Sequence, residues 1–122
     1  MARPILDEAH IHPAIRATLA THQQALVQQV QGLVAQHPLV VVGMAGNPFV
    51  RRARQALGGA GLGHEYLEIG SYISQWRRRN ALKMWTGWPT FPMVFVRGTL
   101  VGGAQDLQRL IASGELARLL AA

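Results

Sequence analysis

The stretch Trp88-Pro89-Thr90-Phe91-Pro92, followed ten residues later by Gly102-Gly103, carries the strongest structural signal in this 122-residue chain. Between the two motifs, Pro92–Val96 and Thr99–Val101 are short apolar runs on either side of Arg97-Gly98. Two β-branched runs around a tight glycine turn are typical of a β-hairpin. The sequence therefore predicts two antiparallel strands between the aromatic motif and the glycine pair.

The apolar spacing on both sides of this hairpin predicts the remaining core elements. Runs rich in valine, and runs in which apolar and polar residues alternate, indicate strands. Apolar residues spaced three or four positions apart indicate helices, and Asn, Gly and Pro mark where these helices begin or end. The expected elements are a strand over Leu39–Val42, a helix from Asn47-Pro48 to the Gly58–Gly63 run, a strand over Tyr66–Ile69, a helix over Ser74–Trp85, and a helix over Asp106–Leu120 interrupted near Ser113-Gly114. This order predicts an α/β protein with a four-stranded mixed sheet and helices on both faces.

The spacing of apolar residues in the N-terminal part predicts an amphipathic helix from about His12 to Gln36, either continuous or broken in two. Pro38 marks the end of this helical segment. Length and hydrophobic content fit a single domain over residues 1–122, with a helical segment over 1–38 and a core over 39–122. No long apolar run or secretory signal is evident, so a cytoplasmic location is the simplest expectation.

Charge and cysteine content limit the possible functions. The formal charge of +6 favours anionic partners, but the clusters Arg51-Arg52-Arg54 and Arg77-Arg78-Arg79 are expected to be solvated helix faces. No nucleic-acid or membrane partner is expected, because no binding module or spanning segment accompanies them. The chain has no cysteine at all, so it cannot supply the thiolate that thiol–disulfide exchange requires.

From Leu39 to Leu120, the chain resembles the glutaredoxin family, a group with the thioredoxin fold. The Trp-Pro-Thr-Phe-Pro motif, the hairpin, Gly102-Gly103 and Ser113-Gly114-Glu115-Leu116 are most similar to the monothiol class. The resemblance implies a thioredoxin-fold core, here extended by the N-terminal helix. The extension that monothiol members carry before the active-site motif is absent.

The segment Asn47-Pro48-Phe49-Val50 resembles the active-site motif Cys-Pro-Tyr-Cys without its cysteines. Asn47 stands at the position of the nucleophile and Val50 at that of the resolving cysteine. Asn47 also fits an ordinary helix N-cap followed by proline at the first helical position. Asn47 cannot ligate an iron–sulfur cluster, and His10 and His12 alone are weak metal ligands, so no cluster or metal is expected.

The resemblance further implies a groove for glutathione, the possible cofactor. Phe91 would offer its backbone amide and carbonyl to the cysteinyl part, beside a cis bond to Pro92. Gly103 and Ala104 would receive the γ-glutamyl carboxylate at a helix N-terminus. The implied set comprises Arg51, Lys83, Thr90, Phe91, Pro92, Gly103, Ala104 and Gln105. Trp88 is expected in the core.

Two charged contacts of the family groove are missing. Met44 stands at the position of the lysine that would pair with the glycyl carboxylate, and Arg51, Arg79 or Lys83 could supply the missing charge. Gln105 stands at the position of the aspartate that would hold the γ-glutamyl amino group, and the only nearby acid is Asp106. Each such loss costs on the order of 1.5–3 kcal/mol, so the two together weaken binding by about a hundredfold or more.

Three functions remain open at this point. The first is a non-catalytic module that binds glutathione, a peptide or a protein and is linked to cell redox homeostasis. The second is an enzyme that uses the thiol of bound glutathione. The third is a structural protein, with a homodimer formed through the apolar side chains of the N-terminal helix, namely Leu26, Val30, Leu33 and Val34.

Overall fold

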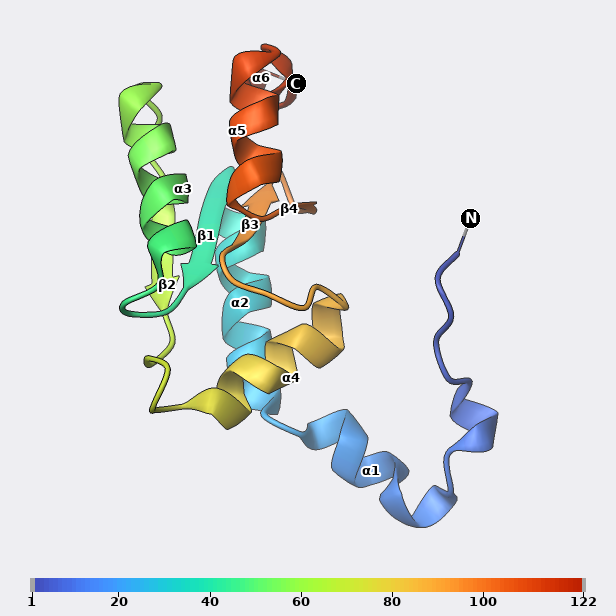
Figure 1. Cartoon of the computed structure of the whole chain (residues 1–122). Helices are drawn as coiled ribbons and strands as arrows, with labels where there is room; N and C mark the ends of the chain where they lie inside the picture. The colour runs from blue at the N-terminus through green and yellow to red at the C-terminus, as the bar shows by residue number, and fades with distance from the viewer. Residues whose placement is uncertain (1, 122) are drawn as a thin grey trace.

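The computed structural model describes residues 2–121, in which four strands form one mixed sheet (Figure 1). The strand order is β2-β1-β3-β4. β1 (Leu39–Gly43) pairs in parallel with β2 (Glu65–Glu68) and antiparallel with β3 (Met93–Val96), which pairs antiparallel with β4 (Thr99–Gly102). The predicted hairpin and the predicted mixed sheet are therefore confirmed.

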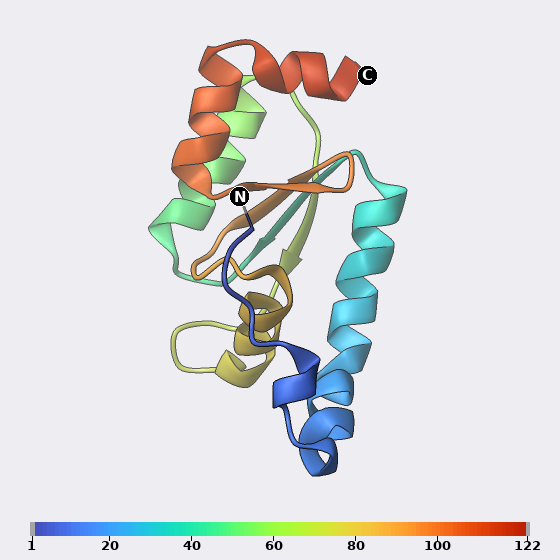
Figure 2. The same cartoon turned by 90° about the vertical axis from the view of Figure 1, so that its right-hand side faces the viewer.

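Helices cover both faces of the sheet (Figure 2). On one face lie α2 (Gln24–Gln36) and α4 (Trp76–Thr86), and on the other α3 (Pro48–Gly59), α5 (Ala104–Ala112) and α6 (Glu115–Ala121). Both faces are apolar because side chains alternate along the central strand, and all five residues of β1 are buried.

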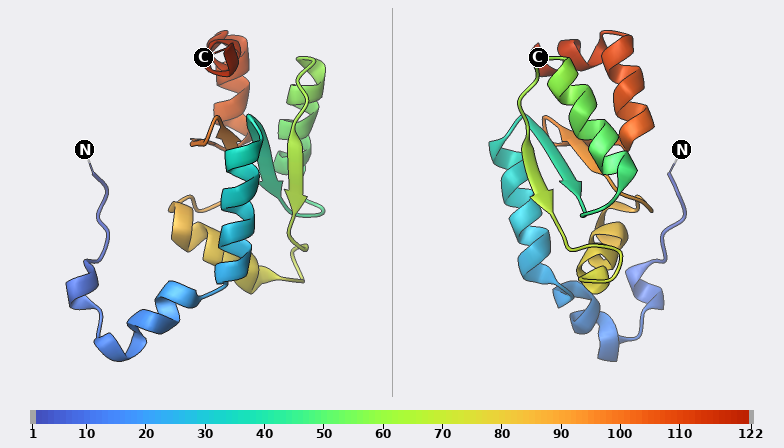
Figure 3. Two further views of the ribbon diagram at one scale, coloured as in Figure 1. Left: turned by 180° about the vertical axis from the view of Figure 1, so that it is seen from behind. Right: turned by 60° about the vertical axis from the view of Figure 1, so that its left-hand side comes forward.

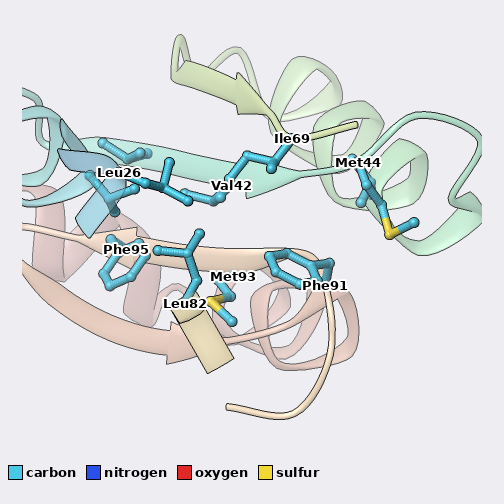
Figure 4. Packing of buried hydrophobic residues seen from close by; sticks show 11 residues of the cluster. Leu26, Val42, Met44, Ile69, Leu82, Phe91, Met93 and Phe95 are labelled. Carbon is cyan, nitrogen blue, oxygen red and sulfur yellow. The ribbon is translucent and has the colours of Figure 1, made fainter. Parts of the chain in front are cut away.

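The core between the sheet and helices α2 and α4 joins Leu26, Val42, Leu82, Met93 and Phe95 (Figure 4). Full burial of one such side chain contributes about 1.5–3 kcal/mol. Leu26 is 3% exposed, and Val30, which belongs to the same expected dimer face, is completely buried. This overturns the idea that these two side chains are free to bury a partner, because the sheet of the same chain already covers them.

The N-terminal region contains a short 3₁₀ turn (Glu8–His10), α1 (Pro13–Thr21) and α2, so the expected helix is broken in two. The break lies at Gln23, whose φ of 50° is left-handed. α1 has no buried residue and projects beyond the sheet (Figures 1 and 3). Leu19 on α1 remains 42% exposed.

Two other boundaries differ slightly from expectation. β2 begins at Glu65 and ends at Glu68, one residue earlier than expected at each end. α4 begins at Trp76, two residues later than expected, because Gln75 adopts a left-handed φ of 56°. The preceding residues instead form a compact turn in which Ser71 and Ser74 pair through their backbones.

Candidate functional site

The first part of the candidate site is the start of α3, where the family motif would carry its cysteines. Asn47 is the N-cap, and its Oδ1 accepts hydrogen bonds from the N–H groups of Phe49 at 2.8 Å and Val50 at 3.2 Å. Pro48 occupies the first turn, as the sequence predicts. Val50 is buried, whereas Phe49 is 46% exposed. The N-cap interpretation of Asn47 is confirmed, and two N–H groups at this helix end are already occupied.

Beside Phe49 lies a groove of about 340 Å³, which we call the cis-proline groove. A volume of this size is at the small end of the range for small-molecule sites. The Phe91–Pro92 peptide bond is cis, as the resemblance implies. The residues that line the groove are Phe49, Trp88, Thr90, Phe91, Pro92, Gly103, Ala104, Gln105 and Asp106. The fold thus brings together the α3 start, the loop before β3 and the α5 start, which are distant in sequence.

The start of α5 forms one wall of the cis-proline groove. Its first intrahelical bond runs from the Leu107 N–H to the Gly103 carbonyl, so the N–H groups of Ala104 and Gln105 precede the helical ladder. Asp106 caps the helix, because its Oδ2 accepts from the Gly103 N–H at 3.0 Å. Sequence reasoning missed this cap, although an acid three residues after a helix boundary is its usual signal. Anionic groups are favoured at such a helix end.

Trp88 belongs to both the core and the groove. Its side chain is half-buried and packs against the α2–α4 side of the sheet, and it also lines the cis-proline groove. The indole N–H is buried beside Gly103 and has no hydrogen-bond partner within residues 2–121. The expected core position of Trp88 is therefore only part of its role.

The charged residues expected near the groove lie in three different environments. The Lys83 Nζ is 5.8 Å from the centre of the Phe91 ring, so Lys83 borders the groove without lining it. Arg79 is only 7% exposed, which corrects the expectation that its cluster is a solvated face. Its Nη1 donates to the carbonyls of Ile69 and Ser74, because a buried guanidinium needs acceptors and finds them in the loop before α4.

Met44, at the position of the family lysine, is 6% exposed and lies with Phe91 at the same end of the sheet (Figure 4). This position contributes an apolar surface and no charge. Of the described residues, Lys83 is the one whose charge lies over the Phe91 ring.

Arg51 does not reach the cis-proline groove. It lines a second hollow of about 400 Å³ between α3 and β2, together with Asn47, Arg54, His64, Tyr66 and others. In this hollow the Arg54 guanidinium lies 3.9 Å above the Tyr66 ring and its Nε donates to His64 Nε2 at 3.2 Å. Burial and a hydrogen bond to Glu68 raise the pKa of Tyr66 to about 12.

His64 is expected to make stability depend on pH. Burial first, and then the charge of Arg54, lower the pKa of His64 below 6.5, so the unfolded chain binds this proton more readily than the folded one. Stability should therefore fall as pH drops through 6.5 toward the folded pKa. Urea denaturation at a series of pH values should show a smaller decrease in the free energy of unfolding for His64→Gln than for the unmodified protein. Identical pH profiles for the two proteins would contradict this role of His64.

The structure also bears on two other kinds of partner, metal ions and lipid bilayers. Among residues 2–121, no three His, Asp or Glu side chains lie close enough together to hold a metal ion, and His12 caps α1. In the same range, no helix is long and apolar enough to cross a bilayer.

The sheet order and the two helical layers define a thioredoxin-fold protein whose site lacks cysteine. The family model described as Glutaredoxin matches residues 39–101. A glutaredoxin-like protein of Dictyostelium discoideum is 44% identical over 91 residues, covering 75% of this chain and 74% of the relative. Glutaredoxin 4 of Escherichia coli K12 is 31% identical over 100 residues, covering 77% and 84%. The chain therefore belongs to the glutaredoxin family.

Solved structures agree with this assignment. A buckwheat glutaredoxin–glutathione complex superposes with a TM-score of 0.72 at 26% identity, covering 82% of this chain and 91% of that chain. Other relatives are much longer: the match spans only 25% of the bifunctional monothiol glutaredoxin-S16, chloroplastic, of Arabidopsis thaliana.

Proposed function

We propose that this protein is a glutathione-binding module that performs no thiol chemistry of its own. The observation that carries the proposal is the cis-proline groove, which unites Phe91, Pro92 and the α5 start in one hollow although every cysteine is absent. The buckwheat relative of the same fold was solved as a glutathione complex. A groove whose contacts come mainly from backbone groups can be retained when side chains change.

In this groove the γ-glutamyl carboxylate would lie at the N–H groups of Ala104 and Gln105, which precede the helical ladder of α5. The cysteinyl part would pair with the Phe91 backbone, and Lys83 would supply positive charge beside the Phe91 ring. The site lacks a free acid for the ligand amino group, because Asp106 caps Gly103. We therefore expect weak binding, with a dissociation constant of about 1 mM.

The start of α3 supports binding over catalysis. An enzyme that activates the thiol of bound glutathione would use free N–H groups at this helix end to stabilise the thiolate. Here the N–H groups of Phe49 and Val50 bond to the Asn47 side chain. The natural chain is accordingly proposed to hold glutathione as a ligand, in a role connected with redox homeostasis.

Amide chemical shifts during a titration with reduced glutathione test this proposal. Saturable shifts at Phe91, Gly103 and Ala104 are expected, without comparable shifts at His64 in the second hollow. Gln105→Asp should tighten binding about tenfold, because it restores a charge-assisted bond to the ligand amino group. The matched control is Gln108→Asp, which adds the same charge on an exposed part of α5 outside the groove.

The outcome that would refute the proposal is the absence of saturable shifts at about 10 mM glutathione, roughly tenfold above the expected dissociation constant. Equal tightening by Gln105→Asp and Gln108→Asp would instead show that the added charge acts at long range, and would refute the proposed position of the amino group.

A further inference from the structure

The loop between β2 and α4, together with Trp76 at the start of α4, displays three large apolar side chains to solvent. Tyr72 is 64% exposed, Ile73 94% and Trp76 54%. The segment that carries them runs from β2 to the start of α4, at the end of the sheet away from α6 (Figures 1 and 3). Single exposed apolar side chains are common on proteins, but a cluster of them marks a contact surface. We call residues 70–76 the apolar loop.

The apolar loop has a defined conformation that keeps these side chains outside the core. The backbones of Ser71 and Ser74 pair with each other, and their hydroxyl oxygens lie 3.1 Å apart. Below the loop, the buried Arg79 donates from Nη1 to the Ser74 carbonyl at 2.6 Å and to the Ile69 carbonyl at 3.0 Å. The exposure of Ile73 is therefore a property of the folded turn.

Positive charge follows the apolar loop along the chain. Residues 70–83 contain four arginine and lysine residues and no acidic residue. The Arg77 guanidinium lies 5.2 Å from the centre of the Trp76 ring, and Arg78 donates to the Gln75 side chain. Arg77 is exposed and neither Arg77 nor Arg78 forms an ion pair within residues 2–121. The loop thus combines an apolar tip with arginines that are available to an anionic surface.

We propose that the apolar loop inserts into the surface of an anionic lipid bilayer, with Arg77 and Arg78 at the headgroups. Trp and Tyr favour the boundary between headgroups and hydrocarbon, where Ile73 would bury its side chain in the hydrocarbon. Each arginine near an anionic leaflet strengthens binding about fivefold. The protein would lie on the membrane, since no helix within residues 2–121 is able to span it.

The shape and composition of the loop favour lipid over nucleic acid. Single-stranded nucleic acid binds in a groove whose aromatic rings stack on the bases. Here the most exposed of the three side chains, Ile73, has no ring, and the three side chains project from a turn. An aliphatic side chain at the tip of a turn gains free energy when it is buried in an apolar medium, which a bilayer provides.

Co-sedimentation with vesicles tests the proposal. We expect the protein to sediment with vesicles of equal phosphatidylglycerol and phosphatidylcholine, and much less with phosphatidylcholine alone. Ile73→Ser should lower the vesicle-bound fraction several-fold, and Arg77→Gln with Arg78→Gln should remove most of the preference for anionic lipid. Trp76 emission should shift to shorter wavelength on binding, and Trp76→Phe should abolish that shift.

Two control variants carry matched changes away from the loop. Leu19→Ser removes an exposed apolar side chain on α1, and Arg109→Gln with Arg118→Gln removes two charges on α5 and α6. Both should bind vesicles like the unmodified protein. Failure to bind anionic vesicles would overturn the proposal, and so would binding that Ile73→Ser leaves unchanged. Retention on a single-stranded oligonucleotide without vesicle binding would assign the surface to nucleic acid and overturn it equally.

Discussion

Replacing Asn47 with cysteine is expected to give this protein the glutathione-dependent disulfide reduction that its natural sequence cannot perform. The side chain at position 47 lies at the N-terminus of α3, where Asn47 now accepts from the N–H groups of Phe49 and Val50. A cysteine there would face the same N–H groups, which lower the pKa of a thiol and favour the thiolate. The thiolate is the form that attacks a disulfide.

The reaction would proceed with a single protein thiol. The Cys thiolate would attack the glutathionyl sulfur of a mixed disulfide, forming a protein–glutathione disulfide and releasing the other thiol. A second glutathione thiolate would then restore the protein thiolate and leave as oxidised glutathione. Val50 is buried and offers no resolving thiol, so the two-cysteine route is closed.

The measurement is the rate of glutathione-dependent reduction of a mixed disulfide, corrected for the reaction of glutathione alone. Asn47→Cys should exceed Asn47→Ser by at least about tenfold, because serine retains a capping oxygen but no nucleophilic sulfur. Both variants are expected to remain folded, at a cost of no more than about 2 kcal/mol. A folded Asn47→Cys variant that binds glutathione and still fails to react would show that the α3 start is not aligned with the groove.

Replacing Gly102 with alanine is expected to destabilise the fold by about 2–4 kcal/mol and to damage the cis-proline groove. Gly102 has a φ of 118°, a conformation that L-residues with a side chain rarely adopt. A Cβ built on Gly102 would lie 2.7 Å from Asp106 Cγ and would collide with the carboxylate that caps Gly103. The substitution therefore adds backbone strain and displaces the cap of α5.

Gly103→Ala provides the matched control for this prediction. Gly103 has a φ of −105°, and its added Cβ would lie 3.5 Å from the Pro92 carbonyl oxygen, an ordinary contact. Its cost should remain below about 1 kcal/mol. Urea denaturation measures both variants, and the glutathione titration should lose its saturable shifts for Gly102→Ala. Equal unfolding midpoints for the two variants would contradict the role of Gly102.

Several elements could be predicted because their signals are local. The run Leu39–Val42 contains three consecutive valines that suit only a strand covered on both sides, and Asn47-Pro48 begins a helix through capping chemistry within a few residues. The break at Gln23 could not be located in this way. Neither proline nor glycine marks it, because packing of α2 against the sheet, rather than a local preference, determines where the helix begins.

The candidate site could be predicted only in part. The resemblance grouped Arg51 with Phe91 and Gly103, yet the structure places Arg51 in the second hollow. Nearness along the chain to Asn47 does not determine on which side of α3 a side chain lies. Likewise, the run Arg77-Arg78-Arg79 is uniform in sequence, but the carbonyls of Ile69 and Ser74 select Arg79 alone for burial.

The sequence by itself determined that this protein has no thiol chemistry, because a missing cysteine cannot be supplied by folding. It also determined the strands and their buried faces, since the alternation of apolar side chains acts within each segment. Only the tertiary structure decided that Asp106 caps α5, that Arg79 supports the apolar loop, and that Phe49 meets the α5 start in one groove. These features depend on contacts between segments distant in sequence, which exist only once the sheet has assembled.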